Sequence, residues 1–132
     1  MNEKEKAYKN QLQGLCCVEI SGESCANCLT LMPILQRLVG ARTDIKLVHV
    51  EADYATVSLM EEWDVVKVPT ILLTDGEKIF ARCAGFQPEE ILEIWLDAKI
   101  EEYKAQQKYR RQQTPYGLFY KEKIIVIIGV VI

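Results

Sequence analysis

The stretch Ser24-Cys25-Ala26-Asn27-Cys28-Leu29 decides the fold class, because it places two thiols two residues apart between a strand and a helix. The preceding run from Leu15 to Ile20 is apolar except for Glu19, which is typical of a strand buried on both faces. After the cysteines, apolar residues recur at helical spacing, at Leu31, Ile34, Leu35, Leu38 and Val39. A Cys-x-x-Cys pair in this strand-to-helix setting favours reversible redox chemistry over metal binding.

The two cysteines are predicted to have different roles. Cys25 falls at the start of the predicted helix, where unpaired amides and the positive end of the helix dipole stabilise a thiolate. Cys25 is therefore the predicted nucleophile, and Cys28, one turn deeper, is the predicted resolving thiol. Half of a structural zinc site is the alternative, and it needs two further ligands. The other Cys and His residues that could supply them are Cys16, Cys17, His49 and Cys83.

Two more polar residues on the predicted strands have alternative interpretations. Glu19, six residues before Cys25, is either a solvated edge residue or a proton acceptor beneath the thiol pair. His49 is the only histidine of the chain and is interpreted as structural or solvent-facing rather than catalytic.

Length and composition indicate one domain. The 132 residues are 49% hydrophobic, which is enough for a single core, and the net charge of −3 selects no partner by itself. Residues 1–98 contain 9 basic and 16 acidic side chains, whereas residues 99–132 contain 7 and 3. Five cysteines form an odd set, and no apolar signal segment opens the chain. We therefore expect a reduced protein in the cytoplasm.

Helices and strands are predicted to alternate along the chain. Pro69 must lie at the start of a strand or at an irregularity, and Asp75-Gly76 is typical of a hairpin turn. The predicted elements are a helix in 2–13, a strand over 15–21, a helix over 25–39 bent at Pro33, a strand over 45–50, a short helix over 54–63, hairpin strands over 71–74 and 78–83, and a helix from Pro88 to Gln113 that buries Ile91, Leu92, Ile94, Trp95 and Leu96.

This order of elements resembles the thioredoxin family over roughly residues 5–98. Glu19 falls where the family has a buried aspartate, and Pro33 matches its helix-kinking proline. Val68-Pro69-Thr70 matches the cis-proline segment that faces the disulfide, and Gly85 matches a glycine after the hairpin.

The resemblance implies an α/β thioredoxin fold, with a central mixed sheet flanked by helices. It also implies a thiol-disulfide oxidoreductase that acts on protein disulfides, has no bound cofactor or metal, and receives electrons from a thioredoxin reductase-type partner. Glu19 would assist deprotonation of Cys28, and Pro69, if cis, would lie near the sulfurs. The site residues implied are Cys25, Cys28, Glu19 and Pro69 for catalysis, and Val68, Thr70, Ala26 and Asn27 for substrate contact.

Three positions depart from the family pattern. Ser24 stands where thioredoxins have tryptophan, Ala26-Asn27 stands where they have Gly-Pro, and Val50 stands where a lysine often accompanies the buried acid. We therefore predict a specialised thioredoxin-like protein. The alternative from another class is a thioredoxin-fold docking module whose thiols are idle.

The C-terminal segment lies beyond the resemblance, so the predicted domain covers residues 1–113 and the tail 114–132. Thr114-Pro115-Tyr116-Gly117 is expected to end the long helix, and residues 124–132 are apolar and β-branched, too short to cross a bilayer as a helix. We predict a strand that pairs with its own sheet edge or with a second copy, giving a homodimer. Shallow membrane attachment aided by the basic residues 108–111 is the alternative, and nothing indicates nucleic-acid binding.

Overall fold

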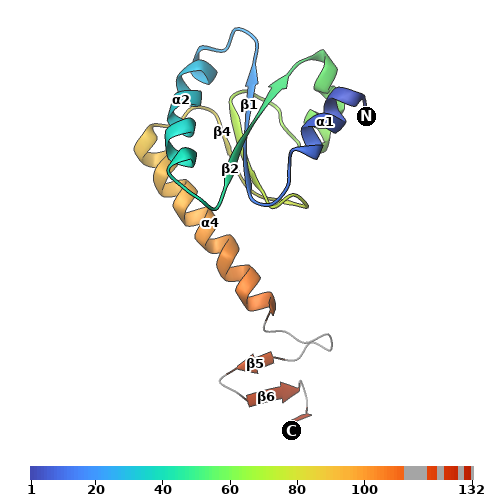
Figure 1. The fold of residues 1–132 in the computed structure, drawn as a ribbon, viewed down its shortest axis with the longest axis vertical. Helices are drawn as coiled ribbons and strands as arrows, with labels where there is room; N and C mark the ends of the chain where they lie inside the picture. The colour runs from blue at the N-terminus through green and yellow to red at the C-terminus, as the bar shows by residue number, and fades with distance from the viewer. Residues whose placement is uncertain (112–118, 122–123, 128–129, 132) are drawn as a thin grey trace. The chain divides into compact units, whose positions relative to one another are not determined.

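The computed structural model describes residues 1–111, 119–121, 124–127 and 130–131 (Figure 1). The chain divides into two compact units, residues 1–93 and 94–132. The predicted boundary after residue 113 lies outside the described residues. In order, the elements are α1 (Glu3–Asn10), β1 (Cys16–Gly22), α2 (Ala26–Gly40), β2 (Lys46–Ala52), the 3-10 turn η1 (Tyr54–Thr56), α3 (Val57–Glu62), β3 (Thr70–Thr74), β4 (Ile79–Ala84), α4 (Glu89–Arg111), β5 (Phe119–Lys121), β6 (Ile124–Ile127) and β7 (Val130–Val131).

Four strands form the predicted mixed sheet in the order β2-β1-β3-β4. The central strand β1 runs parallel to β2 and antiparallel to β3, and β3 and β4 form the predicted hairpin. Every residue of β1 from Cys16 to Ser21 is buried, as its apolar sequence predicted. The parallel register pairs Glu19 with His49, which brings together two ionisable residues that are 30 positions apart in sequence.

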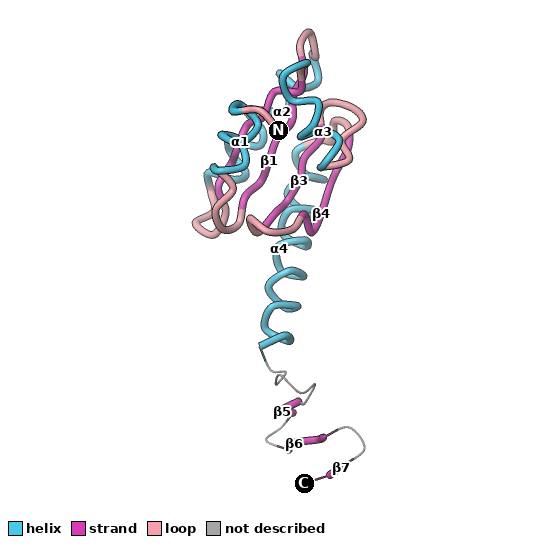
Figure 2. Tube along the Cα trace, turned by 90° about the vertical axis from the view of Figure 1, so that its right-hand side faces the viewer, coloured by secondary structure: helices cyan, strands magenta, loops and turns pink. Residues whose placement is uncertain are grey.

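Helices cover both faces of this sheet. Figure 1 shows α2 on one side of β1 and β2 and α1 on the other, and Figure 2 shows α3 near α1. The α1 and α3 side holds an apolar cluster that includes Cys16, Val18, Ile20, Val48, Val50, Leu59 and Trp63. Because side chains alternate along a strand, Glu19, Ser21, His49 and Glu51 lie on the α2 side. These polar side chains of β1 and β2 therefore lie on the face of the sheet that α2 covers.

A buried glutamate holds α1 in place. Asn2 caps the helix. Its side chain accepts a hydrogen bond from the amide of Glu5, and the side chain of Glu5 accepts one from the amide of Asn2. Tyr8 and Leu12 pack on the apolar cluster, and Glu5 is buried whereas Ala7 is exposed. Glu5 can be buried because its carboxylate has a partner inside the fold, the amide of Leu59, which donates a hydrogen bond to it.

The long C-terminal helix is confirmed up to Arg111, but the prediction included more buried residues than the structure has. Leu92, Leu96 and Ile100 are buried at a spacing of four residues, whereas Ile91 is 51% and Ile94 is 67% exposed. A helix buries one stripe of its surface, and Ile91 and Ile94 lie off that stripe.

The described part of the tail forms a separate antiparallel sheet in the order β5-β6-β7. The single predicted strand from Ile124 is divided into β6 and β7. β6 pairs with both β5 and β7, and none of these three strands pairs with β2 or β4. The predicted break at residues 114–117 lies outside the described residues. Across the described parts of the chain, the structure contains no helix with the length and hydrophobicity needed to span a membrane.

Candidate active site

Cys25 and Cys28 form a disulfide at the N-terminus of α2, with 5.3 Å between their Cα atoms. Cys25 is the N-cap residue, and the amide of Cys28 donates a hydrogen bond to Cys25 Sγ over 3.3 Å. Ser24, with a φ of +57°, makes the sharp turn that leads from β1 into the helix. Cys25 is half-buried and Cys28 is only 3% exposed. Cys25 is therefore the more accessible of the two, and its position at the cap favours a thiolate once the disulfide opens.

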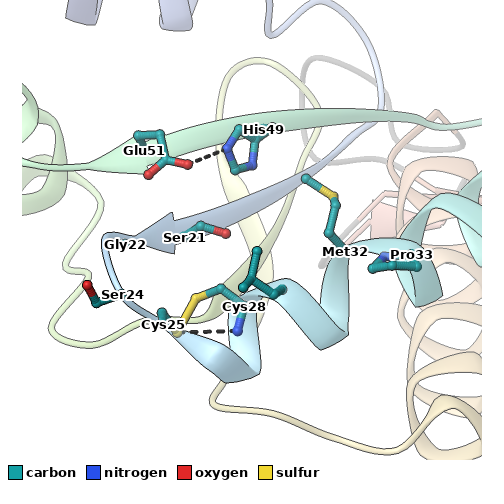
Figure 3. Close-up of a pocket in the computed structure, with 10 residues that line it drawn as sticks. Ser21, Gly22, Ser24, Cys25, Cys28, Met32, Pro33, His49 and Glu51 are labelled. Carbon is teal, nitrogen blue, oxygen red and sulfur yellow. Dashed lines mark hydrogen bonds and ion pairs between the residues drawn. A yellow bond between two sulfur atoms is a disulfide. The ribbon is translucent and has the colours of Figure 1, made fainter.

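A cavity of about 460 Å³ opens beside this disulfide (Figure 3). Its walls come from the end of β1, the first turns of α2 and the second half of β2. Besides the two cysteines, the side chains that matter for its chemistry are Ser21, Leu29, Met32, His49 and Glu51. The cavity therefore combines thiols, an imidazole, a carboxylate and an apolar wall.

The predicted proline segment precedes β3, and the Val68-Pro69 peptide bond is cis. Pro69 is buried, its carbonyl accepts a hydrogen bond from the amide of Gly85, and Thr70 Oγ1 donates to the carbonyl of Lys67. The side chain of Val68 lies against Gly22 at the end of β1. These contacts hold the segment close to the strand that leads into the thiol pair.

The structure places none of the predicted substrate-contact residues in the lining of the cavity. Val68, Pro69 and Thr70 are outside its lining, and Ala26 and Asn27 are exposed in the first turn of α2. Their contacts with a substrate stay predictions.

Glu19 is completely buried, so its interpretation as a solvated edge residue is wrong. Ser21 Oγ donates a hydrogen bond to Glu19 Oε2, and His49 Nδ1 lies 2.6 Å from Glu19 Oε1. A buried carboxylate needs such partners, because an unpaired charge in the interior is strongly unfavourable.

His49 is the functional residue that the sequence analysis undervalued. It lines the cavity, and its second nitrogen, Nε2, lies 2.7 Å from Glu51 Oε1 (Figure 3). Burial lowers the pKa of His49, but hydrogen bonds to Glu19 and Glu51 outweigh it, and the pKa is raised above 6.5. Val50, at the family's lysine position, is buried on the opposite face of the sheet, and the basic partner of Glu19 is its neighbour His49. The signal that could have identified His49 is its position in the predicted strand next to the first one, where the parallel register pairs it with Glu19.

The remaining cysteines do not converge on the thiol pair. Cys16 belongs to the apolar cluster on the far face of the sheet, and Cys17 is completely buried. Burial raises the pKa of the Cys17 thiol to about 12, and burial also raises the pKa of Cys83. Among the described residues, no three His, Cys, Asp or Glu side chains are grouped to hold a metal ion. The zinc alternative therefore has no ligand set in the described part of the chain.

A four-stranded mixed sheet, a disulfide at the N-terminus of the helix after β1 and a cis-proline before β3 together define a thioredoxin-like fold. The family model described as Thioredoxin matches residues 1–98, and the chain belongs to the thioredoxin family. A comparison with curated proteins found no match.

Several solved structures share the fold at low sequence identity. A mutant thioredoxin from Halobacterium salinarum is 19% identical, with a TM-score of 0.59 over 75% of this chain and 84% of that chain. A complex of ferredoxin:thioredoxin reductase and thioredoxin f2 gives 14% identity and a TM-score of 0.65, over 71% of this chain and 88% of that chain. Thioredoxin-2 of the malaria parasite is 21% identical, with a TM-score of 0.57 over 64% of this chain and 82% of that chain.

Proposed function

We propose that this protein is a thiol-disulfide oxidoreductase that exchanges disulfides with protein substrates through Cys25 and Cys28. The observation that carries the proposal is the disulfide between the helix-capping Cys25 and the sheltered Cys28, at the wall of an open cavity. Helix amides that face the sulfur favour a thiolate, which is the attacking species in disulfide exchange.

The exchange proceeds in two balanced steps. The Cys25 thiolate attacks a substrate disulfide, a mixed disulfide forms, and the first substrate thiolate leaves and takes up a proton. Cys28 then gives up its proton and attacks Cys25 Sγ, which releases the second substrate thiolate. The substrate has gained two electrons, and the protein ends with the Cys25–Cys28 disulfide that the structure contains.

Other residues support these steps. The buried carboxylate of Glu19 accepts the proton of Cys28, and Ala26 and Asn27 set the environment of the thiolate in the first helical turn. The backbone beside the cis Val68-Pro69 bond pairs with an extended substrate segment as an added strand, with Thr70 at its base.

The electron donor that we propose is a thioredoxin reductase-type enzyme. The complex of thioredoxin f2 with ferredoxin:thioredoxin reductase supports this class of partner for a chain of the same fold. Three further cysteines without a disulfide, Cys16, Cys17 and Cys83, support residence in a reducing compartment such as the cytoplasm.

A turnover assay tests the proposal. Reduction of insulin disulfides by dithiothreitol is followed with the wild-type chain, the Cys25→Ser variant and Cys83→Ser as the matched control. We expect Cys25→Ser to fall to the rate of dithiothreitol alone and Cys83→Ser to retain wild-type turnover. If the wild-type chain itself gives no acceleration, or Cys25→Ser keeps it, the oxidoreductase proposal fails.

A further inference from the structure

Three ionisable side chains run in line from the interior to the edge of the cavity. Glu19 Oε1 lies 2.6 Å from His49 Nδ1, and His49 Nε2 lies 2.7 Å from Glu51 Oε1. The exposure of these side chains increases along the row, from 0% for Glu19 to 39% for His49 and 44% for Glu51. We call these three residues the Glu-His-Glu row. It leads from a buried carboxylate to water.

The donor and acceptor count requires two protons within this row. An ionised carboxylate only accepts hydrogen bonds, and a neutral imidazole donates from only one of its nitrogens. Both nitrogens of His49 face carboxylate oxygens, so each contact needs a proton, carried either by the imidazole or by a carboxyl group. A row that already holds a proton in each hydrogen bond can accept one at one end while it releases another at the far end.

The row lies next to the thiols. His49 and Glu51 line the cavity that Cys25 and Cys28 also line, and Ser21, which bonds to Glu19, lines it too (Figure 3). The groups that face His49 in this cavity are Glu19 from β1, Glu51 from β2 and the two thiols from α2. The other residues that α2 contributes, Leu29, Met32 and Pro33, are uncharged. His49 and Glu51 of the row are therefore the ionisable side chains of the cavity wall besides the two cysteines, and Glu19 lies behind them.

We propose that His49 and Glu51 form a proton path that links the buried Glu19 to solvent and so sets the rate at which Cys28 resolves the mixed disulfide. This inference rests on the proposed function. The two residues act through Glu19, so they are positioning residues for the exchange rather than groups that touch the sulfurs.

The path balances the proton of the resolving step. Cys28 transfers its proton to Glu19 as its sulfur attacks Cys25 Sγ, and the Nε2 proton of His49 passes to Glu51 and then to water. The charge of the row is unchanged by this transfer. The proton released at Glu51 replaces the one that the departing substrate thiolate takes from water.

The single histidine gives a direct readout of the path. Since His49 is the only imidazole in the chain, its NMR titration needs no assignment by mutation. Resolution by Cys28 is measured separately by adding Ellman's reagent to the reduced protein. The first thionitrobenzoate is released when Cys25 is modified, and the second when Cys28 displaces it from Cys25.

We expect the pH profile of the second release to show a step whose midpoint coincides with the NMR midpoint of His49, because His49 loses one of the two protons of the row there. Glu51→Gln should move both midpoints to lower pH by at least about 0.5 unit, because the imidazolium loses one of its two carboxylate partners. His49→Gln should remove this step from the profile and slow resolution at pH 7 on the order of tenfold. Glu77→Gln, an exposed glutamate in the β3–β4 turn, is the matched control and should behave as wild type.

Failure of this inference is distinguishable from failure of the proposed function. If the second release occurs but Glu51→Gln shifts the NMR midpoint without shifting the kinetic one, His49 is only a structural partner of Glu19. Wild-type resolution in His49→Gln overturns the path as well. If the wild-type protein shows no second release at all, the oxidoreductase proposal itself fails. Glu51→Gln changes a half-exposed side chain, so it remains informative even if His49→Gln does not fold.

Discussion

The carboxylate of Glu5 in α1 accepts a hydrogen bond from the amide of Leu59 in α3, with 2.6 Å between Oε2 and N. Its other oxygen accepts from the amide of Asn2 over 3.1 Å. Thr56, the residue before α3, makes no capping hydrogen bond to that helix through its own side chain. A single buried glutamate thus provides hydrogen-bond acceptors to the first turns of two helices that are distant in sequence.

Glu5→Gln is therefore expected to destabilise the fold. The amide that replaces the carboxylate brings a donor next to the amides of Asn2 and Leu59, and one of the two bonds is lost. We expect a Tm lower by about 5 °C or more in thermal unfolding followed by circular dichroism. Glu3→Gln, exposed in the same helical turn, is the control and should leave the Tm unchanged.

The same glutamate predicts a pH dependence of stability. The hydrogen bond from Asn2 outweighs the opposing effect of burial and, with the bond from Leu59, lowers the pKa of Glu5 below 4.5. A carboxyl group with a depressed folded pKa stabilises the fold fully above its unfolded pKa, and this contribution is lost as the pH falls through the folded value. Urea denaturation at pH 3 to 7 should show a smaller loss toward low pH in Glu5→Gln than in wild type. Parallel curves for the two proteins would contradict the assignment.

Gly22→Ala should disturb the segment that contains the cis-proline. An added Cβ would lie 2.9 Å from Val68 Cγ2, closer than the two carbons can approach, and valine has few alternative rotamers. We expect a loss of about 1–3 kcal/mol in the free energy of unfolding. Gly40→Ala is the matched control, because an added Cβ meets nothing within 4 Å there. Recovery in the double variant with Val68→Ala would locate the clash, and wild-type stability of Gly22→Ala would refute it.

The five thiols should react in an order set by burial. In the reduced native protein, iodoacetamide should modify Cys25 first and Cys17 last, because burial raises the pKa of Cys17 to about 12. At pH 8 such a pKa reduces the thiolate fraction about a thousandfold relative to an ordinary cysteine. Peptide mapping by mass spectrometry gives the order, and equal labelling in urea is the control. Early modification of Cys17 in the native protein would show that β1 opens readily.

Leu29 is expected to contribute to the binding of protein substrates. It follows Cys28, lines the cavity and is 79% exposed, so its removal costs the fold little. Leu29→Ser should lower kcat/KM for insulin roughly tenfold, the effect of losing one largely buried leucine contact in a complex. The alkylation rate of Cys25 and the Tm should not change. Unaltered kcat/KM would place the substrate elsewhere.

Local patterns were enough to predict the thiol pair and the proline segment. Cys25 caps the helix and Cys28 lies in its first turn, and Pro69 was expected at the start of a strand or at an irregularity, so both predictions depend on a few neighbouring residues. The mixed sheet was implied by the resemblance to the thioredoxin family, and the β3–β4 hairpin was predicted from Asp75-Gly76.

The role of His49 could not be predicted in the same way. Its pairing with Glu19 depends on the register of β1 against β2, which is fixed only when the whole sheet packs under α2. The exposure of Ile91 and Ile94 has a similar origin, since hydrophobic residues around a helix do not specify which stripe is buried. The burial of Glu5 could not be predicted from the sequence of α1, because its partner, the amide of Leu59, belongs to α3.

The tip of the β3–β4 hairpin is a poor site for substitutions or insertions. Gly76 has a φ of +97°, and a Cβ at this position would lie 2.9 Å from the carbonyl oxygen of Leu12, an atom of the backbone that cannot step aside as a flexible side chain can. Hairpin tips are commonly chosen for epitope tags, fluorophore attachment or new chain ends. In this protein, an insertion at that tip would displace the backbone around Leu12. The connection that follows Gly40, where an added Cβ meets nothing within 4 Å, is the better place for one.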